Sequence, residues 1–187
     1  MIPTNTLTTA AIYAPYGPPE DAPYDPFRHV VRGGVALGDP SQGRNSQNWE
    51  VTYSAGTIWV GRVGQASVFS LVVAGVLSVS LAFDNNMQVA VGYMNSSGAN
   101  LYYFNSLSSS YQTFTVSGAT SCKVCVDDNR GFADATSDVI FAYTLAGVLY
   151  WTQQRDRYAT PRVVGNTVRR LERLGLSKGA RLQFGLN

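Results

Sequence analysis

Hydrophobic and polar positions alternate in short stretches between about residues 33 and 164, and Gly, Ser, Asn and Asp separate these stretches. Alternation with a period of two is typical of strands that bury one face. Three of the stretches begin around a turn glycine, and they read SAGTIWVGRV (54–63), SSGANLYYFN (96–105) and LAGVLYWTQQ (145–154). The pattern predicts an all-β, antiparallel fold that is built from internal repeats.

The repeat extends on both sides of each glycine-led stretch. An alternating strand precedes it (NWEVTY, MQVAVGY or DVIFAYT), and a closing strand follows it (ASVFSLV, YQTFTVS or YATPRVV). The second and third repeats also begin with a strand that ends in aspartate, VSLAFD or CKVCVDD. Gly56, Gly98 and Gly147 are spaced by 42 and 49 residues, and the insertion NRGFADATS accounts for the larger spacing. Four-stranded antiparallel meanders at this spacing resemble β-propeller blades.

We therefore expect two to three blades, with two complete ones and a partial first one. Closed propellers need about four to eight blades, so the repeats form an open array or are completed by other subunits. A β-sandwich of about ten strands is the alternative fold.

Different segments flank the repeat domain, which we place at 33–164. Residues 1–32 are rich in Pro and Tyr, which predicts an extended N-terminal arm whose aromatic side chains (Tyr13, Tyr16, Tyr24 and Phe27) lie on another surface. Residues 165–187 are rich in basic side chains and predict a C-terminal arm or an edge strand. Within them, Val168 to Leu176 is compatible with a short helical turn, but Gly165, Gly175 and Gly179 bracket it tightly. ARLQFGL alternates as an edge strand would.

The composition narrows the classes of function. Charged residues make up only 14% of the chain, which suggests that other subunits cover part of its surface. The net charge of +2 is too small to indicate specific nucleic-acid binding. Serines and a glycine interrupt the longest apolar stretch, SVFSLVVAGVLSVSLAF, so we expect strands there and no membrane insertion. The N-terminus lacks the pattern of a signal peptide, and synthesis in a cytoplasm is expected.

The sequence contains no pattern that is typical of an active site. Cys122 and Cys125 point to opposite faces of a strand, so they are expected to be reduced thiols that share no ligand. The only histidine, His29, stands in the N-terminal arm, far from any candidate nucleophile. The acidic residues at 127–128, 134 and 138 belong to no calcium-binding loop. We expect neither enzymatic activity nor a cofactor nor a metal.

The stretch QQRDRY stands where an aromatic strand turns towards the closing strand of the third repeat. Leu149 and Trp151 share one face of that strand, and Tyr150 and Thr152 share the other. Two interpretations remain open. The first is a charged turn in which Asp156 bonds to a neighbouring arginine or to backbone amides. The second is a glycan-binding shelf. The candidate turn or interface residues are Trp151, Gln153, Gln154, Arg155, Asp156, Arg157 and Tyr158.

Between about residues 35 and 187 the chain resembles a family of tailed-bacteriophage tail proteins. The resemblance rests on LAFDNNMQVAVGY, LYYFNS, SDVIFAYTLAGVLYWTQQRDRYATP and the terminal RLQFGL, of which QQRDRY after an aromatic strand is the most specific. Cys122 and Cys125 depart from the pattern, and the arm before residue 30 is not covered.

The resemblance implies a structural component of the virion tail, at the level of the nozzle, tip, baseplate or fibre attachment. It implies a homo-oligomer, such as a ring, that binds other tail proteins, and it transfers no catalytic residue. Low charge and flanking arms agree with a symmetric assembly. The alternative is a receptor- or glycan-binding module of the tail tip, whose partner would be a host surface glycan.

Overall fold

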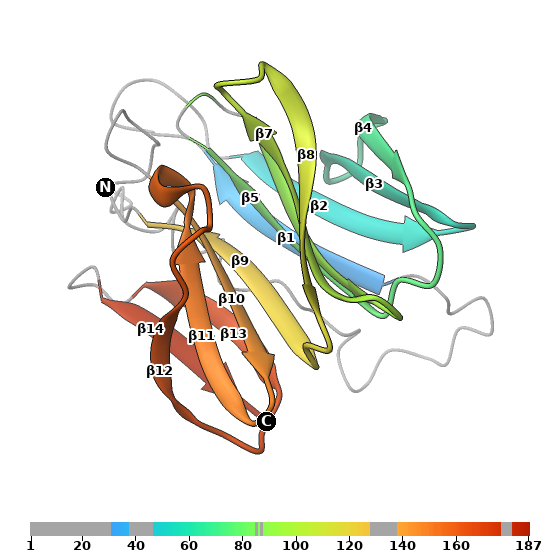
Figure 1. Ribbon diagram of the computed structural model, residues 1–187. Coiled ribbons are helices and arrows are strands. Elements are labelled where there is room, and N and C mark those ends of the chain that lie inside the picture. The colour runs from blue at the N-terminus through green and yellow to red at the C-terminus, as the bar shows by residue number, and fades with distance from the viewer. Residues whose placement is uncertain (1–30, 38–46, 85, 87, 128–137, 177–180) are drawn as a thin grey trace, which may run out of the picture.

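The computed structural model describes residues 31–37, 47–84, 86, 88–127, 138–176 and 181–187, which form four antiparallel sheets (Figure 1). Three sheets contain four strands each, and the fourth is a hairpin. Sheet one contains β1 (Val31–Leu37), β2 (Gln47–Ser54), β3 (Thr57–Arg62) and β4 (Ser67–Val72), and sheet two contains β5 (Ser78–Phe83), β6 (Val89–Asn95), β7 (Gly98–Asn105) and β8 (Ser110–Ser117). Sheet three contains β9 (Ser121–Val126), β10 (Val139–Leu145), β11 (Val148–Gln153) and β12 (Arg162–Asn166), and sheet four contains β13 (Leu171–Leu176) and β14 (Leu182–Leu186).

The all-β prediction is confirmed, and the strands of each sheet follow one another in chain order. The repeat pattern also placed the second, third and fourth strands of each four-stranded sheet near their observed positions. The expectation of a partial first repeat was wrong, because β1 completes sheet one by pairing with β2 from Val31↔Tyr53 to Leu37↔Gln47. Gly33 and Gly34 lie inside β1, and glycine weakens the strand signal of a sequence.

Glycine permits the hairpin turns in two repeats, as predicted. In the β2–β3 turn Ala55 and Gly56 have φ of 49° and 78°, and in the β10–β11 turn Ala146 and Gly147 have φ of 50° and 78°. Two successive residues with positive φ are typical of a two-residue type I′ turn. Gly98 is different, because it is the first residue of β7 and its φ is 122°.

The first strands of successive sheets lie next to one another, in the order β1, β5, β9 and β13. Serine side chains bridge two of these neighbouring edges. The Ser80 hydroxyl on β5 accepts a hydrogen bond from the Val124 amide on β9 at 3.0 Å. The Ser121 hydroxyl on β9 accepts one from the Leu171 amide on β13 at 2.8 Å. An unpaired buried amide is costly, so these serines allow the inner edges to be covered by neighbouring sheets.

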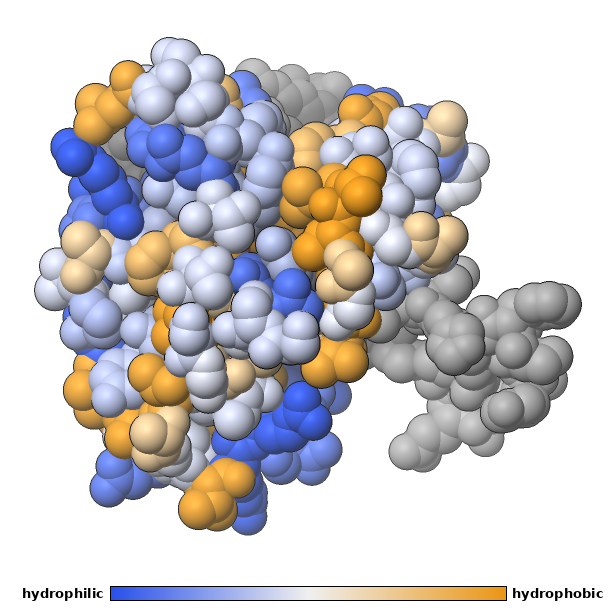
Figure 2. Space-filling view, turned by 45° about the vertical axis from the view of Figure 1, so that its right-hand side comes forward, coloured by the Kyte–Doolittle hydropathy of each residue, from blue (hydrophilic) through white to orange (hydrophobic). Residues whose placement is uncertain are grey.

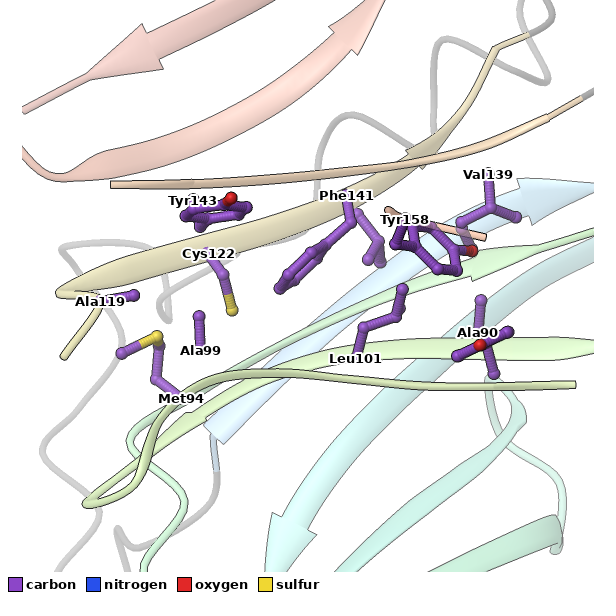
Figure 3. Packing of buried hydrophobic residues seen from close by; sticks show 13 residues of the cluster. Ala90, Met94, Ala99, Leu101, Ala119, Cys122, Val139, Phe141, Tyr143 and Tyr158 are labelled. Carbon is purple, nitrogen blue, oxygen red and sulfur yellow. The ribbon is translucent and has the colours of Figure 1, made fainter. Parts of the chain in front are cut away.

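Three hydrophobic cores lie between consecutive sheets. Sheets one and two enclose a core that includes Ile58 and Leu81, and sheets three and four enclose one that includes Ile140 and Leu174. Between them, side chains of sheets two and three, such as Leu101 and Phe141, point toward one another (Figure 3). The sheets thus pack face to face, as in a β-sandwich. Their first strands, β1, β5, β9 and β13, lie side by side, as the innermost strands of neighbouring propeller blades do.

The C-terminal segment contributes strands and no helical turn. The interpretation of Val168 to Leu176 as a short helix was wrong, because β13 occupies Leu171–Leu176 and pairs with β14. Leu171 and Leu174 are buried against sheet three, and this packing favours a strand in the segment. β14 confirms the expected edge strand. Most of the N-terminal arm (residues 1–30) and the 129–137 insertion lie outside the described residues.

On the face that Figure 2 shows, apolar side chains form separate patches among polar ones. Several exposed valines lie on or beside the outer strands of sheets one and three, namely Val63, Val68, Val72, Val163, Val164 and Val168. The described residues include no helix that is long and apolar enough to cross a membrane.

Candidate functional site

Residues 153–158, which we call the 153–158 turn, connect β11 to the segment that leads into β12. A single 3-10 turn, η2, spans Gln154–Asp156, and Arg157 and Tyr158 follow with φ of 57° and 63°. The Arg157 amide donates to the Gln154 carbonyl at 2.8 Å, and the Tyr158 amide donates to the Gln153 carbonyl at 3.0 Å. Two successive non-glycine residues in the left-handed region are unusual, so packing around the turn must hold this conformation.

Arg155 binds carboxylates that lie outside the turn. The buried Asp138 carboxylate, just before β10, accepts hydrogen bonds from the Arg155 backbone amide at 2.9 Å and from Nε at 2.5 Å. Asp127, at the end of β9, lies 3.7 Å from an Arg155 guanidinium nitrogen. The hydrogen bond to Asp138 and the charge of that carboxylate raise the pKa of Arg155. The prediction of an ion pair within QQRDRY was therefore wrong for Arg155.

Gln154 connects the turn to sheet two. Its side-chain amide donates to the Asp84 carboxylate at 3.3 Å, across 70 residues of sequence. Asp84 follows β5, is 4% exposed, and also accepts from the backbone amides of Asn86 at 2.9 Å and Gln88 at 2.8 Å. These three donors solvate a carboxylate that burial would otherwise destabilise.

Asp156 pairs with the first residue of the closing strand. An Arg162 guanidinium nitrogen approaches the Asp156 carboxylate to 2.9 Å, but no hydrogen bond is directed at either carboxylate oxygen. The partner is therefore Arg162, and the predicted bonds to Arg155, Arg157 or backbone amides are not formed. The same guanidinium lies over the Trp151 ring, 4.7 Å from its centroid. Trp151 is partly buried against the core between sheets three and four, on the same face as Leu149, as predicted.

Tyr158 anchors the turn in the core between sheets two and three. It is 1% exposed and lies among the buried side chains of this core (Figure 3). Its ring meets Tyr103 edge-on at 4.8 Å and lies 6.0 Å from Phe114. Its hydroxyl is buried without a hydrogen-bond partner. Burial, followed by the negative charge of Asp138, raises the pKa of Tyr158 well above its ordinary value.

The two cysteines lie on opposite faces of β9, as the strand geometry predicted. Cys122 belongs to the core between sheets two and three, and Cys125 to the core between sheets three and four. Burial raises the pKa of both thiols, that of Cys122 to about 12. Thiols of this kind are poor nucleophiles at neutral pH. Among the described residues, no three His, Cys, Asp or Glu side chains are grouped to hold a metal ion.

The 153–158 turn follows β11 of sheet three and connects that sheet to sheet two. Gln154 and Tyr158 contact sheet two, while Arg155 contacts residues that flank β9 and β10. Arg162 covers one face of the Trp151 ring, so that face is not free to stack on a sugar. Two charged groups of the turn, Arg155 and Asp156, pair with side chains of neighbouring segments, which is the arrangement expected of a structural contact.

Sequence reasoning identified the turn but did not identify its carboxylate partners. Asp84 and Asp127 follow the first strands of successive repeats, and this shared position was the available signal. Asp138 stands out in the sequence only as an acidic residue outside any calcium-binding loop, although it directly precedes a buried strand. Arg155 meets Asp138 because β10 and β11 pair in sheet three, from Ile140↔Gln153 onward. Gln154 meets Asp84 because sheets two and three pack together, and that contact is not encoded in local spacing.

Comparison of the chain with known proteins found no matching family model, no matching curated protein and no matching solved structure.

Proposed function

We propose that this chain is a non-enzymatic structural component of a bacteriophage tail, where it assembles with copies of itself and with other tail proteins. The assignment to a tail rests on the resemblance of QQRDRY and the strands around it. The observation that carries the structural role is that side chains of the QQRDRY segment are held by partners elsewhere in the fold, Gln154 by Asp84, which follows β5 of sheet two, and Arg155 by Asp138, which precedes β10 of sheet three. The nozzle, tip, baseplate and fibre-attachment levels all remain within this proposal.

The series of sheets also supports assembly with neighbours. Sheet four contains only β13 and β14 among the described residues, whereas the other sheets contain four strands each. Repeat architectures bury the faces of their units by stacking, and end units require a cap or a partner. A chain with 14% charged residues is suited to having part of its surface covered in an assembly.

Analysis of purified particles tests the proposal. Particles are purified on a density gradient, tails are separated from heads, and the proteins of each fraction are quantified by mass spectrometry. The chain is expected in the tail fraction, at a copy number that is a multiple of the tail symmetry. Recovery of the chain only from the soluble lysate, with none in particles, would refute the tail assignment.

A second candidate function is binding of a host surface glycan, and one cluster of aromatic side chains favours it. Tyr102 and Tyr111 are stacked with centroids 4.9 Å apart, and Phe69 and Phe104 adjoin Tyr111. All four side chains are partly exposed, and the Tyr111 hydroxyl donates to the Gln88 side chain at 3.0 Å. Aromatic faces with neutral amides nearby are suited to sugars, which present apolar C–H faces and hydroxyls.

Cell binding separates the two functions. The purified chain would bind host cells without the rest of the particle if it is a glycan-binding module, and Tyr102→Ser would abolish that binding without lowering the melting temperature much. A chain that enters particles but binds no cells and no glycan array would eliminate this second candidate.

A further inference from the structure

The outer edge strands of the four sheets differ in their protection against pairing with another chain. An edge strand has alternate amides and carbonyls without ladder partners, and proteins normally protect it with bulges, charges or proline. β4 has an extra residue, Val68, at an irregularity in its pairing with β3. β12 has a similar irregularity at Val164, begins with Arg162 and follows Pro161.

β8 has none of these protective features. It pairs with β7 through eight consecutive positions, from Gly98↔Ser117 to Asn105↔Ser110, without a register shift. Its sequence, SYQTFTVS, has no charge and no proline, and threonines and a valine favour extended backbone. Among the described strands, none pairs with its other edge.

The sheet that contains β8 is also nearly uncharged. Between residues 63 and 122, Asp84 is the only Asp, Glu, Lys or Arg, and it is buried. The exposed residues of β8 itself are Ser110, Gln112, Thr113, Thr115 and Ser117. Two copies of this edge would therefore meet without like-charge repulsion, and depletion of charge is typical of the centre of protein interfaces. A charged partner would find no complementary charge here.

We infer that β8 pairs antiparallel with β8 of a second copy of this chain, across a two-fold axis, so that two sheets join into one. This inference deepens the self-assembly part of the proposed function. The contact is isologous, because the same strand serves on both sides, and by itself it produces a dimer. Antiparallel pairing of identical strands places their middle residues nearest the axis, which here is close to Thr113.

The test measures association of the full chain by light scattering over a range of concentrations. Thr113→Lys places a charge at the middle of the edge and is expected to weaken self-association about tenfold or more. Two matched controls accompany it. Thr113→Val removes the hydroxyl without adding charge, and Ser70→Lys adds a charge to the exposed edge of β4. Both controls are expected to associate as the parent chain does, and thermal melting checks that every variant is folded.

A covalent test locates the axis. Thr113→Cys is expected to form a disulfide-linked dimer under mild oxidation, whereas Ser70→Cys, on the edge of β4, is not. The native thiols are buried and therefore do not contribute to the cross-linking. A folded Thr113→Lys variant that associates like the parent chain would overturn the inference, as would a parent chain that stays monomeric at every concentration or equal cross-linking at both positions. A dimer that forms in solution while the chain is absent from purified tails would refute the tail function but leave the β8 contact standing.

Discussion

The Ser80 hydroxyl accepts a hydrogen bond from the Val124 backbone amide at 3.0 Å, and so joins the inner edges of sheets two and three across 44 residues of sequence. The same hydroxyl donates to the Gly92 carbonyl at 3.3 Å. Ser121 repeats the arrangement one sheet further on, at Leu171. At these two inner edges a small polar side chain thus hydrogen-bonds a backbone amide of the next sheet where the sheets stack.

Ser80→Ala removes the acceptor for the Val124 amide in a buried position. The free energy of unfolding is expected to fall by about 1–3 kcal/mol, the usual cost of leaving a buried polar group unsatisfied. Ser117→Ala, at an exposed position of β8, is the control and should change it little. Urea denaturation measures both. Equal stabilities for the two variants would show that the Ser80 bond does not support the packing of the sheets.

Gly98→Ala should be destabilising for two reasons. Its φ of 122° is rarely adopted by residues with a side chain, and an added Cβ would lie 2.3 Å from the Val116 carbonyl oxygen. We expect a loss of roughly 1–3 kcal/mol, measured by urea denaturation. Gly165→Ala is the matched control, because its Cβ would meet no atom within 4 Å. A Gly98→Ala variant as stable as this control would contradict the close approach of Gly98 on β7 to the Val116 carbonyl on β8.

Tyr158→Phe removes a buried hydroxyl that has no hydrogen-bond partner and leaves the ring in the core. The variant is expected to be as stable as the parent chain or more stable by about 1 kcal/mol, because no bond is lost and a desolvated polar group is removed. Tyr158→Ala instead leaves a cavity and should cost about 3–5 kcal/mol. Differential scanning calorimetry distinguishes the two. A marked loss in Tyr158→Phe would indicate that the hydroxyl has a partner.

Alkaline pH should destabilise the chain through Cys122. Burial raises the pKa of this thiol from its ordinary value of 9.0 to about 12, so the folded protein retains the proton that the unfolded chain releases. The stabilisation is complete below pH 9 and is lost as the pH rises towards 12. Melting curves of Cys122→Ala should therefore show a shallower alkaline decline than those of the parent chain. Parallel declines would show that Cys122 is not shielded in the folded state.

Much of the fold could be predicted because the strands carry a local signal. Alternating side chains located β6, β7 and β10, and a turn glycine located the hairpins at Gly56 and Gly147. β1 was missed because its two glycines carry no alternating side chains. β13 was not located because LERLGL has no clear alternation and is also compatible with a short helical turn, and packing against sheet three holds it as a strand.

The candidate site was predictable only as a segment. QQRDRY stood out by its charge and by its place after an aromatic strand, but its partners come from the neighbouring strands of sheet three and from sheet two. Asp138 is 17 residues from Arg155, and Asp84 is 70 residues from Gln154. The burial of Tyr158, a residue that ends a charged turn, likewise follows from the packing of sheet two on sheet three.

The central claim is that the 153–158 turn is a structural contact and not a ligand site. Its most direct test is thermal unfolding of Asp138→Ala and Trp151→Ala beside an assay of binding to host cells. Asp138→Ala removes the buried acceptor of two Arg155 donors, so a loss of about 1–3 kcal/mol is expected, of which the partly exposed ion pair contributes little. Trp151 is only partly buried, so its truncation should cost about 2–3 kcal/mol. Lowered melting temperatures in both variants are the predicted result, whereas unchanged melting with lost binding to cells would contradict the claim.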